Sequence, residues 1–220
     1  MSLKIEEYPL VQVYDNVLDR EYCELLIDLF HNKKDFQQKG QLGGFGDTIY
    51  EDEKIKKTTD VFLKHFLDDM NQRQLENSIL RCVDNYCQDK EVLYNYFALN
   101  GEMNYKVTEF IMMKYEQGEG EFRTHCDWNA NPYGASGTSL RTLSVCIYLN
   151  DVNVGAELKF KHLGFSIKPK AGRIVLFPPY WTHQHKGAVP ISGDKYVIST
   201  WIRFKFEIFN TKTNSILIDD

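Results

Sequence analysis

The sequence of 220 residues lacks any apolar run that approaches the roughly 20 residues needed to cross a bilayer. The first residues, Met1 to Glu7, also lack the basic stretch followed by an apolar stretch that marks a secretory signal peptide. These two absences argue against a membrane-embedded or secreted protein. We therefore expect a cytoplasmic protein without membrane contact.

Cysteine is scarce, and no two cysteines stand in a Cys-x-x-Cys pair. The five cysteines are Cys23, Cys82, Cys87, Cys126 and Cys146. An odd number at wide spacing indicates neither a disulfide framework nor a cysteine zinc site. Reduced thiols in a cytoplasm fit this pattern best.

The sequence also lacks an excess of basic residues. Its net charge is −5 and its pI is about 5.7, so it has no overall attraction for phosphate backbones or anionic lipid, and we expect no nucleic-acid partner. Apolar residues make up 43% and charged residues 26%, which is typical of a folded globular protein. The length predicts one domain over residues 1–220 and leaves the oligomeric state open.

Residues 1–106 predict a mainly helical support region. Residues 10–14 alternate like a short strand, and Asp19 stands where an N-cap would precede a helix with an apolar face. Apolar residues recur at helical spacing from about 70 to 90, which predicts a second helix. Residues 43–46 are rich in glycine and predict a loop, whereas Lys56 to Leu63 fit either a strand or a helix.

Residues 107–210 predict a β-structure. Short runs of Val, Ile, Phe and Tyr alternate with glycine-containing turns, and we place strands near 107–115, 121–127, 140–149, 155–161, 164–169, 172–178 and 194–208. Two packed antiparallel sheets cover so many short strands with few exposed edges. The predicted fold is therefore mainly β with α, a double-stranded β-helix (a cupin-like jelly-roll core) flanked by N-terminal helices.

A metal site is predicted around His125 and Asp127. Side chains two residues apart in a strand point to the same side, so this imidazole and this carboxylate can converge on one ion. A third ligand must come from elsewhere, and both His183 and His185 are candidates. Two imidazoles and one carboxylate on one side of a metal leave open positions, the arrangement that suits non-haem Fe(II).

Lys195 is predicted to carry the charge at the other end of this site. In a strand through the core, Lys195, Val197, Ser199 and Trp201 share one face, which would point an ammonium group inward. A buried ammonium group requires an anion, and a dicarboxylate cosubstrate could provide it. Trp201, on the same face, is predicted to line the cosubstrate pocket.

The stretch from Tyr115 to Trp201 resembles the prolyl 4-hydroxylase-like branch of the iron(II)/2-oxoglutarate oxygenases. The matching segments lie in the carboxyl-terminal half: Tyr115-Glu116-Gln117-Gly118, His125-x-Asp127, Arg141-Thr142-Leu143, Tyr148-Leu149-Asn150-Asp151, Gly155 to Phe160, Pro169-x-x-Gly172-Arg173, His185-x-Gly187 and Gly193-x-Lys195-Tyr196.

The resemblance implies that His125, Asp127 and His185 bind iron and act in catalysis, that Lys195 pairs with the distal carboxylate of 2-oxoglutarate, and that Tyr115 hydrogen-bonds this cosubstrate. His185 is preferred to His183 because its spacing to Lys195 is that of the family. Ala156 and Leu158 depart from the family pattern, where a second glycine and a threonine are common.

The implied activity is that of a dioxygenase. It would use Fe(II), 2-oxoglutarate and O2, with ascorbate as a candidate reductant, to hydroxylate a substrate carbon and release succinate and CO2. A peptidyl proline is the substrate that the resemblance favours, while other protein residues, free amino acids and small metabolites stay open.

Two other functions are compatible with the same ligands. Zinc in this site would activate water for hydrolysis, and a jelly-roll protein could bind a ligand without catalysis. Neither accounts for Lys195 at the family spacing. Arg141 and Arg173 could face the pocket or sit in structural ion pairs, and the structural role is favoured for both. Residues 128–139 predict a loop beside the metal, which could contact substrate or be an ordinary surface connection.

Overall fold

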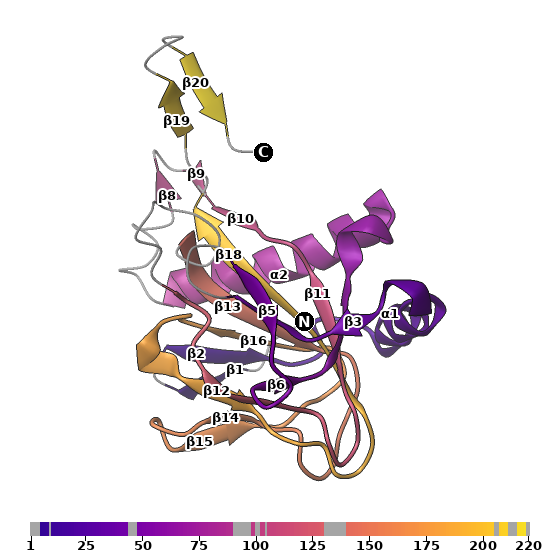
Figure 1. Ribbon diagram of the computed structural model, residues 1–220. Helices are drawn as coiled ribbons and strands as arrows, with labels where there is room; N and C mark the ends of the chain where they lie inside the picture. The colour runs from indigo at the N-terminus through magenta and orange to yellow at the C-terminus, as the bar shows by residue number, and fades with distance from the viewer. Residues whose placement is uncertain are drawn as a thin grey trace.

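The computed structural model describes residues 5–8, 10–43, 48–89, 98–99, 102–103, 105–129, 140–204, 207–210 and 215–218. Within these residues two antiparallel sheets and two long helices form three layers (Figure 1). The larger sheet lies in the middle, with the helices on one face and the smaller sheet on the other. This is the jelly-roll with N-terminal helices that the sequence predicts.

The larger sheet has nine strands, all paired antiparallel. Their order is β1 (Ile5–Tyr8), β2 (Val11–Tyr14), β16 (Arg173–Phe177), β13 (Arg141–Tyr148), β18 (Lys195–Phe204), β11 (Ile111–Tyr115), β7 (Thr59–Phe62) and β3 (Gln38–Lys39), with β10 (Tyr105–Val107) also paired to β18. The long strand β18 thus contacts three neighbours and runs through the middle of the molecule.

The smaller sheet has five strands in the order β15 (Phe165–Ile167), β14 (Leu158–Phe160), β17 (His185–Gly187), β12 (Glu121–His125) and β6 (Lys56–Lys57). Three separate hairpins add β4 (Gln41–Gly43) with β5 (Ile49–Glu51), β8 (Ala98–Leu99) with β9 (Glu102–Met103), and β19 (Glu207–Asn210) with β20 (Ser215–Ile218). Short 3-10 turns cover Lys34–Phe36, Leu63–His65 and Trp181–His183.

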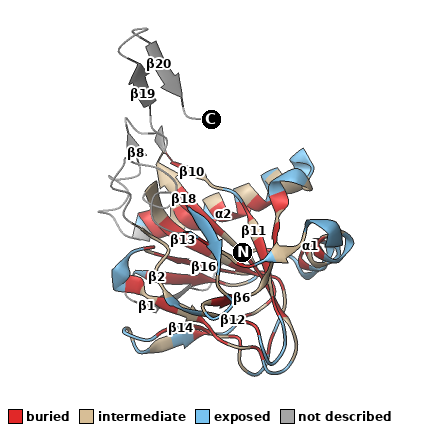
Figure 2. Cartoon of the chain, viewed as in Figure 1, coloured by how far each residue is buried: buried red, intermediate tan, exposed pale blue. Residues whose placement is uncertain are grey.

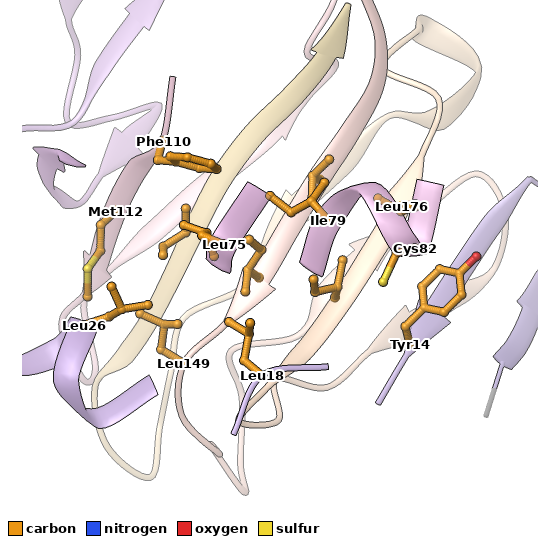
Figure 3. Packing of buried hydrophobic residues seen from close by; sticks show 14 of the residues in the cluster. Tyr14, Leu18, Leu26, Leu75, Ile79, Cys82, Phe110, Met112, Leu149 and Leu176 are labelled. Carbon is orange, nitrogen blue, oxygen red and sulfur yellow. The ribbon is translucent and has the colours of Figure 1, made fainter. Parts of the chain in front are cut away.

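The helices α1 (Arg20–Asn32) and α2 (Asp69–Asp89) cover one face of the larger sheet. Leu75, Ile79 and Cys82 of α2 recur at helical spacing and pack toward Met112 and Leu176 of the sheet (Figure 3). Burial of such side chains contributes about 1.5–3 kcal/mol each, so this face of α2 holds the helix in place. Asp19 occupies the N-cap position of α1, but its side chain makes no capping hydrogen bond.

A second core of buried side chains lies between the two sheets. Figure 2 shows much of the larger sheet in red, the colour of buried residues. Along β18, Ile198 and Ile202 pack toward the helices, whereas Val197 packs toward the smaller sheet. This alternation follows from the two-residue period of a strand. It places every second side chain of β18, beginning with Lys195, in the space between the sheets.

Several predicted boundaries are wrong. The strand predicted at 107–115 is split into β10 and β11, because Thr108 donates its N–H to Trp201 and the carbonyl of Phe110 accepts from Leu63. The strand predicted at 194–208 corresponds to β18, which begins at Lys195 and is described as far as Phe204, and residues 205–206 lie outside the described ones. Residues 56–63, compatible with either structure, form β6 and β7, and the predicted glycine loop falls partly on residues 44–47, outside the described ones.

The N-terminal half contributes more than helices. Strands β1, β2, β3 and β7 extend the larger sheet at its two ends, and β6 extends the smaller one.

All five cysteines are free, as predicted. No helix in the described part of the chain is long and apolar enough to span a membrane.

Candidate active site

His125 and His185 are direct cross-strand partners in the smaller sheet. His125 ends β12 and His185 begins β17, and these two antiparallel strands place their Cα atoms opposite each other. The ring centroids are 4.3 Å apart. Two imidazoles that are 60 residues apart in the sequence are therefore held together by backbone pairing, the most rigid support that a sheet offers.

Asp127 brings a carboxylate to the two imidazoles. Its Oδ1 lies 3.4 Å from Nε2 of His125 and 3.7 Å from Nε2 of His185. The backbone N–H of Asp127 donates to the carbonyl of Pro179, which fixes the chain just beyond β12. The ligand atoms of these three residues all lie within 4.8 Å of one another.

The second carboxylate oxygen of Asp127 is held from the larger sheet. Ser144 Oγ donates to Oδ2 over 2.6 Å, and the indole Nε1 of Trp201 donates to the same oxygen over 3.0 Å. With Oδ2 occupied, Oδ1 is the oxygen that faces the imidazoles. Such outer contacts orient a ligand and are a usual part of metal sites.

Both imidazoles present Nε2 to the same point. Nδ1 of His125 lies 2.7 Å from the carbonyl oxygen of Arg123, and Nδ1 of His185 lies 3.0 Å from that of His183. A carbonyl only accepts, so each Nδ1 carries the proton and donates it, which leaves a lone pair on each Nε2. Phe122 stacks on His125 with centroids 3.5 Å apart and fixes its ring plane.

The protonation states of Asp127 and His185 favour the binding of a cation. Burial alone would raise the pKa of Asp127, but His185, His125 and Arg141 beside it hold the pKa well below its usual range. Burial, together with the neighbouring His125, lowers the pKa of His185 to about 4. The cluster is therefore an ionised carboxylate beside a neutral His185, the protonation states that metal binding requires.

The donor set fits a ferrous ion. Three donors on one side of a metal, each about 2.1 Å from it, lie about 3 Å apart, so the distances of 3.4 and 3.7 Å from Asp127 would contract by less than 1 Å around an ion. The structure brings together the two imidazoles and the carboxylate that the sequence predicts as ligands, with His185 rather than His183 among them.

Lys195 and Tyr115 are cross-strand partners at the beginning of β18 and the end of β11. Lys195 is only 3% exposed, and its Nζ lies 3.6 Å from the centre of the Tyr115 ring and 3.4 Å from the carbonyl oxygen of Ala156. Among the described residues, no carboxylate pairs with this Nζ. Burial lowers the pKa of Lys195 to about 7.

An ammonium group buried without a counter-ion is costly, so this position favours an anionic ligand. Burial also raises the pKa of Tyr115 well above its usual value, so the phenol stays protonated and can donate. The inward lysine predicted from strand parity thus lies beside the predicted tyrosine.

One cavity of about 1030 Å3 contains all of these groups. It lies between the two sheets and is lined by the metal cluster, by Tyr115, and by Lys195, Val197, Ser199 and Trp201 of β18. The common face predicted for those four residues of β18 is therefore confirmed. Lys195 lies at one end of this row, and Trp201 touches the metal cluster.

Two small residues lie beside Tyr115 and Lys195. Gly187 follows His185 by two residues, and a Cβ there would lie 2.9 Å from the hydroxyl of Tyr115. Any larger residue would displace the phenol that the motif His185-x-Gly187 accommodates. Ala156, where the family commonly has glycine, adopts a positive φ of 66° and presents the carbonyl that contacts Lys195.

Arg141 takes the less favoured of the two positions that the sequence allows, because it faces the cavity. Its guanidinium lies 3.4 Å over the Trp201 ring and Nη1 donates to the carbonyl of Asp127 over 2.8 Å. It lines the cavity. Sequence reasoning missed Ser144, which holds Asp127. Its position on β13, three residues after Arg141, gives no signal unless the strand pairing is known.

Other candidates lie elsewhere. Arg173 forms an ion pair with Asp15 and is structural, as interpreted. His183 is buried in a 3-10 turn outside the metal cluster. Of the predicted substrate loop, Asn129 lines the cavity and Trp128 lies near Tyr180, while residues 130–139 lie outside the described ones.

Comparison with known proteins gives the same picture. Residues 110–203 match the 2OG-Fe(II) oxygenase superfamily. The chain is 23% identical to the probable prolyl 4-hydroxylase 10 of Arabidopsis thaliana, over 89% of this chain and 69% of that protein.

Two solved structures share the fold. A prolyl-4-hydroxylase from Pseudomonas putida aligns with a TM-score of 0.63 and 14% identity, over 90% of this chain and 94% of that one. A prolyl hydroxylase from Trichoplax adhaerens, in complex with a hypoxia inducible factor peptide fragment, aligns with a TM-score of 0.60 and 18% identity, over 89% of this chain and 84% of that one. The matched family, the curated relative and the site geometry agree on an iron- and 2-oxoglutarate-dependent dioxygenase that is similar to the prolyl 4-hydroxylases.

Proposed function

We propose that this dioxygenase hydroxylates a carbon of a peptide substrate, with a peptidyl proline as the preferred target. In this proposal His125, Asp127 and His185 hold the iron, and Lys195 and Tyr115 hold 2-oxoglutarate. The observation that carries the proposal is the convergence of the three ligand atoms within 4.8 Å in the cavity where Lys195 is buried.

Each residue has a physical task. Nε2 of both histidines and Oδ1 of Asp127 would occupy one side of the ion, because their other polar atoms are committed to Arg123, His183, Ser144 and Trp201. The opposite side then faces the cavity. When bound, the iron and 2-oxoglutarate supply the oxidation, which consumes O2 and yields succinate and CO2.

The protein positions the cosubstrate and excludes water. The ammonium group of Lys195 would donate to the distal carboxylate of 2-oxoglutarate, an interaction that also relieves the cost of its burial. The phenol of Tyr115, next to it, would donate a further hydrogen bond. The apolar residues Val197 and Leu158, which line the same cavity, restrict water around both groups.

A peptide substrate is supported by the size of the cavity and by the relatives. The cavity of about 1030 Å3 exceeds what one 2-oxoglutarate molecule fills. The Trichoplax adhaerens relative was solved with a peptide fragment. Ascorbate as reductant, the single-domain organisation and the cytoplasmic location remain predictions.

Oxygen-dependent conversion of 2-oxoglutarate to succinate tests the activity, and mass spectrometry of proline-containing peptides for the gain of one oxygen atom tests the substrate. We expect Asp127→Ala to abolish both, while the exposed Asp35→Ala, chosen as a matched control, retains both. Full turnover in Asp127→Ala would remove the carboxylate from the mechanism, and hydrolysis of a substrate without O2 would favour the zinc alternative.

A further inference from the structure

A buried ion pair joins the two sheets beside the metal cluster. Lys56 belongs to β6 of the smaller sheet and Asp60 to β7 of the larger sheet. Nζ of Lys56 lies 2.6 Å from Oδ2 of Asp60, and the two side chains are only 5% and 2% exposed. Lys56 also lines the cavity that contains His125. The binding of iron and 2-oxoglutarate as proposed does not use this pair, so its burial calls for an explanation.

Neighbouring groups hold the pair in one geometry. Thr58 Oγ1 donates to Oδ1 of Asp60 over 2.7 Å, and Nζ of Lys56 also donates to the carbonyl of Gln41 over 3.2 Å. The chain passes close to the pair at Gly40, where an added Cβ would clash with Thr58 Oγ1 and lie 3.0 Å from Cδ of Lys56. The ammonium group therefore has a fixed position between β4, β6 and β7.

The ammonium group of Lys56 also contacts the ring that supports His125. Lys56 and Phe122 are Cα partners in the pairing of β6 with β12, two strands that Figure 1 shows beside each other. Nζ lies 5.4 Å from the centre of the Phe122 ring, within the range of a cation–π interaction. Phe122 in turn stacks on the imidazole of His125, with the ring planes inclined by 14°. A continuous series of contacts thus leads from Asp60 to the metal cluster.

The stack on His125 depends on an irregular register in β12. Phe122 lies opposite Gly187 and His125 lies opposite His185, so three steps along β12 match two steps along β17. Residues three apart in a regular strand point to opposite sides, but one extra residue turns the second side chain to the side of the first. Because the ladder is interrupted between them, the plane of the His125 ring depends on its contact with Phe122 as well as on backbone pairing.

Stability gives little reason to bury these two charges. The cost of removing them from water largely offsets their attraction, and apolar residues of similar volume often stabilise a protein equally well. A hydrogen-bonded ion pair differs from such residues in its directionality, because Lys56 and Asp60 satisfy each other in one geometry only. Apolar side chains at the same places would fill the space without orienting Phe122.

We propose that Lys56 and Asp60 are positioning residues, which act through Phe122 to hold the imidazole of His125 in the orientation that binds the metal. This inference rests on the proposed function, in which His125 is a ligand. It gives the N-terminal half of the chain a part in forming the metal site, since one of the three ligands depends on β6 and β7.

Replacement of both charges separates positioning from stability. In Lys56→Met/Asp60→Leu we expect the urea midpoint of unfolding to change little, because the volumes are similar and no charge is left unpaired. We expect the affinity for Co(II) to fall about tenfold, as for the loss of a contact that orients a ligand. The visible absorption of bound Co(II), which reports the ligand geometry, should change as well. Unchanged affinity and an unchanged spectrum in the double variant overturn the inference.

A substitution of the ring tests the route to His125, and it does so even if the double variant does not fold. Phe122→Leu should lower the affinity for Co(II) by about the same factor, because the support of His125 is lost whichever contact is removed. The triple variant should bind Co(II) within about twofold of either, since residues in one series of contacts are not additive. Independent effects would multiply to about a hundredfold, and that result, or normal affinity in Phe122→Leu, overturns the inference.

A neighbouring ion pair on β6 provides the matched control. Lys57 pairs with Glu119, but their side chains are 45% and 61% exposed, and neither residue lines the cavity. Lys57→Met/Glu119→Gln removes an ion pair from the same strand and should leave both the affinity for Co(II) and the spectrum unchanged. An equal loss of affinity in this control would mean that any disturbance of β6 weakens the metal site, and would overturn the specific role of Lys56 and Asp60.

Succinate formation by the iron-loaded protein is measured in parallel. Its absence in the unaltered protein, together with the absence of Co(II) binding, would overturn the proposed function. Succinate formation by the unaltered protein, with the same Co(II) affinity and spectrum in Lys56→Met/Asp60→Leu, would overturn only the positioning role of the pair.

Discussion

The indole N–H of Trp201 donates a hydrogen bond of 3.0 Å to Oδ2 of Asp127, so the larger sheet holds a carboxylate that follows a strand of the smaller sheet. This bond crosses the cavity between the two sheets. It leaves Oδ1 directed at the two imidazoles and makes the ligand geometry depend on how the sheets pack.

Replacing this donor should weaken metal binding without removing a ligand. We expect Trp201→Phe to lower the affinity for Fe(II) by about 10- to 100-fold, because the carboxylate loses one of the two hydrogen bonds that orient it. Anaerobic isothermal titration calorimetry with Fe(II) measures the effect. Trp181→Phe, at an exposed indole outside the cavity, is the control and should bind metal normally. Unchanged affinity in Trp201→Phe would show that this bond does not orient the ligand.

The two neighbouring histidines should behave differently. His185→Ala removes a ligand atom, so we expect Fe(II) binding and succinate formation to be lost. His183→Ala leaves the cluster intact and should retain metal affinity, while the free energy of unfolding falls by about 1–3 kcal/mol because a buried side chain is removed. Titration with Co(II), followed by its visible absorption, compares the two variants. Retained binding in His185→Ala together with loss in His183→Ala would reverse the assignment.

Affinity for 2-oxoglutarate should depend on the charge of Lys195. Burial lowers the pKa of this ammonium group to about 7, and only the protonated form pairs with a carboxylate. A bound carboxylate raises the pKa in the complex, so above pH 7 binding requires uptake of a proton. We expect the dissociation constant to be flat below pH 7 and to rise above it by up to about tenfold per pH unit.

Titration calorimetry on the Mn(II)-loaded protein over this pH range measures the effect. Lys195→Arg is the control, because its guanidinium stays charged throughout and should remove the dependence, at the expense of a poorer fit in the pocket. A flat profile for the unaltered protein would contradict a lysine with a lowered pKa as the anchor.

Stability should depend strongly on Gly172, at the turn before β16. This residue has a φ of 75°, and an added Cβ would lie 2.1 Å from the carbonyl oxygen of Leu18. We expect Gly172→Ala to lower the free energy of unfolding by more than about 3 kcal/mol, since backbone strain and a steric clash combine. Gly164→Ala has a similar φ of 78° with no atom near the added Cβ, and should cost only about 1–2 kcal/mol.

Chemical denaturation of both variants measures this difference. An equal loss of unfolding free energy in Gly172→Ala and Gly164→Ala would mean that the φ angle alone matters at Gly172. Both sites lie away from the cavity, so neither variant should change the stoichiometry of metal binding.

Local patterns in the sequence predicted much of this molecule. The two-residue period placed Lys195, Val197, Ser199 and Trp201 on one face, and the helical period in α2 selected Leu75 and Ile79 as its buried side, because both periods are properties of the backbone itself. The spacing of His125 and Asp127 likewise indicated two converging ligand atoms, although β12 ends at His125 and Asp127 lies just beyond the strand.

Local patterns failed where a choice depended on distant partners. Residues 56–63 became strands because β7 pairs with β11 and β6 pairs with β12, neither of which is near in the sequence. Arg141 and Arg173 looked alike as basic residues beside strands. Arg173 meets Asp15, while Arg141 meets Asp127 and Trp201, and nothing in their immediate neighbours distinguishes the two.

The sequence by itself determined which residue types could form the site and which face of each strand they occupy, because side-chain direction follows from backbone geometry alone. Only the tertiary structure decided that His125 faces His185 and that Trp201 reaches Asp127. These relationships depend on the register between strands far apart in the chain, which is fixed by the packing of the whole core.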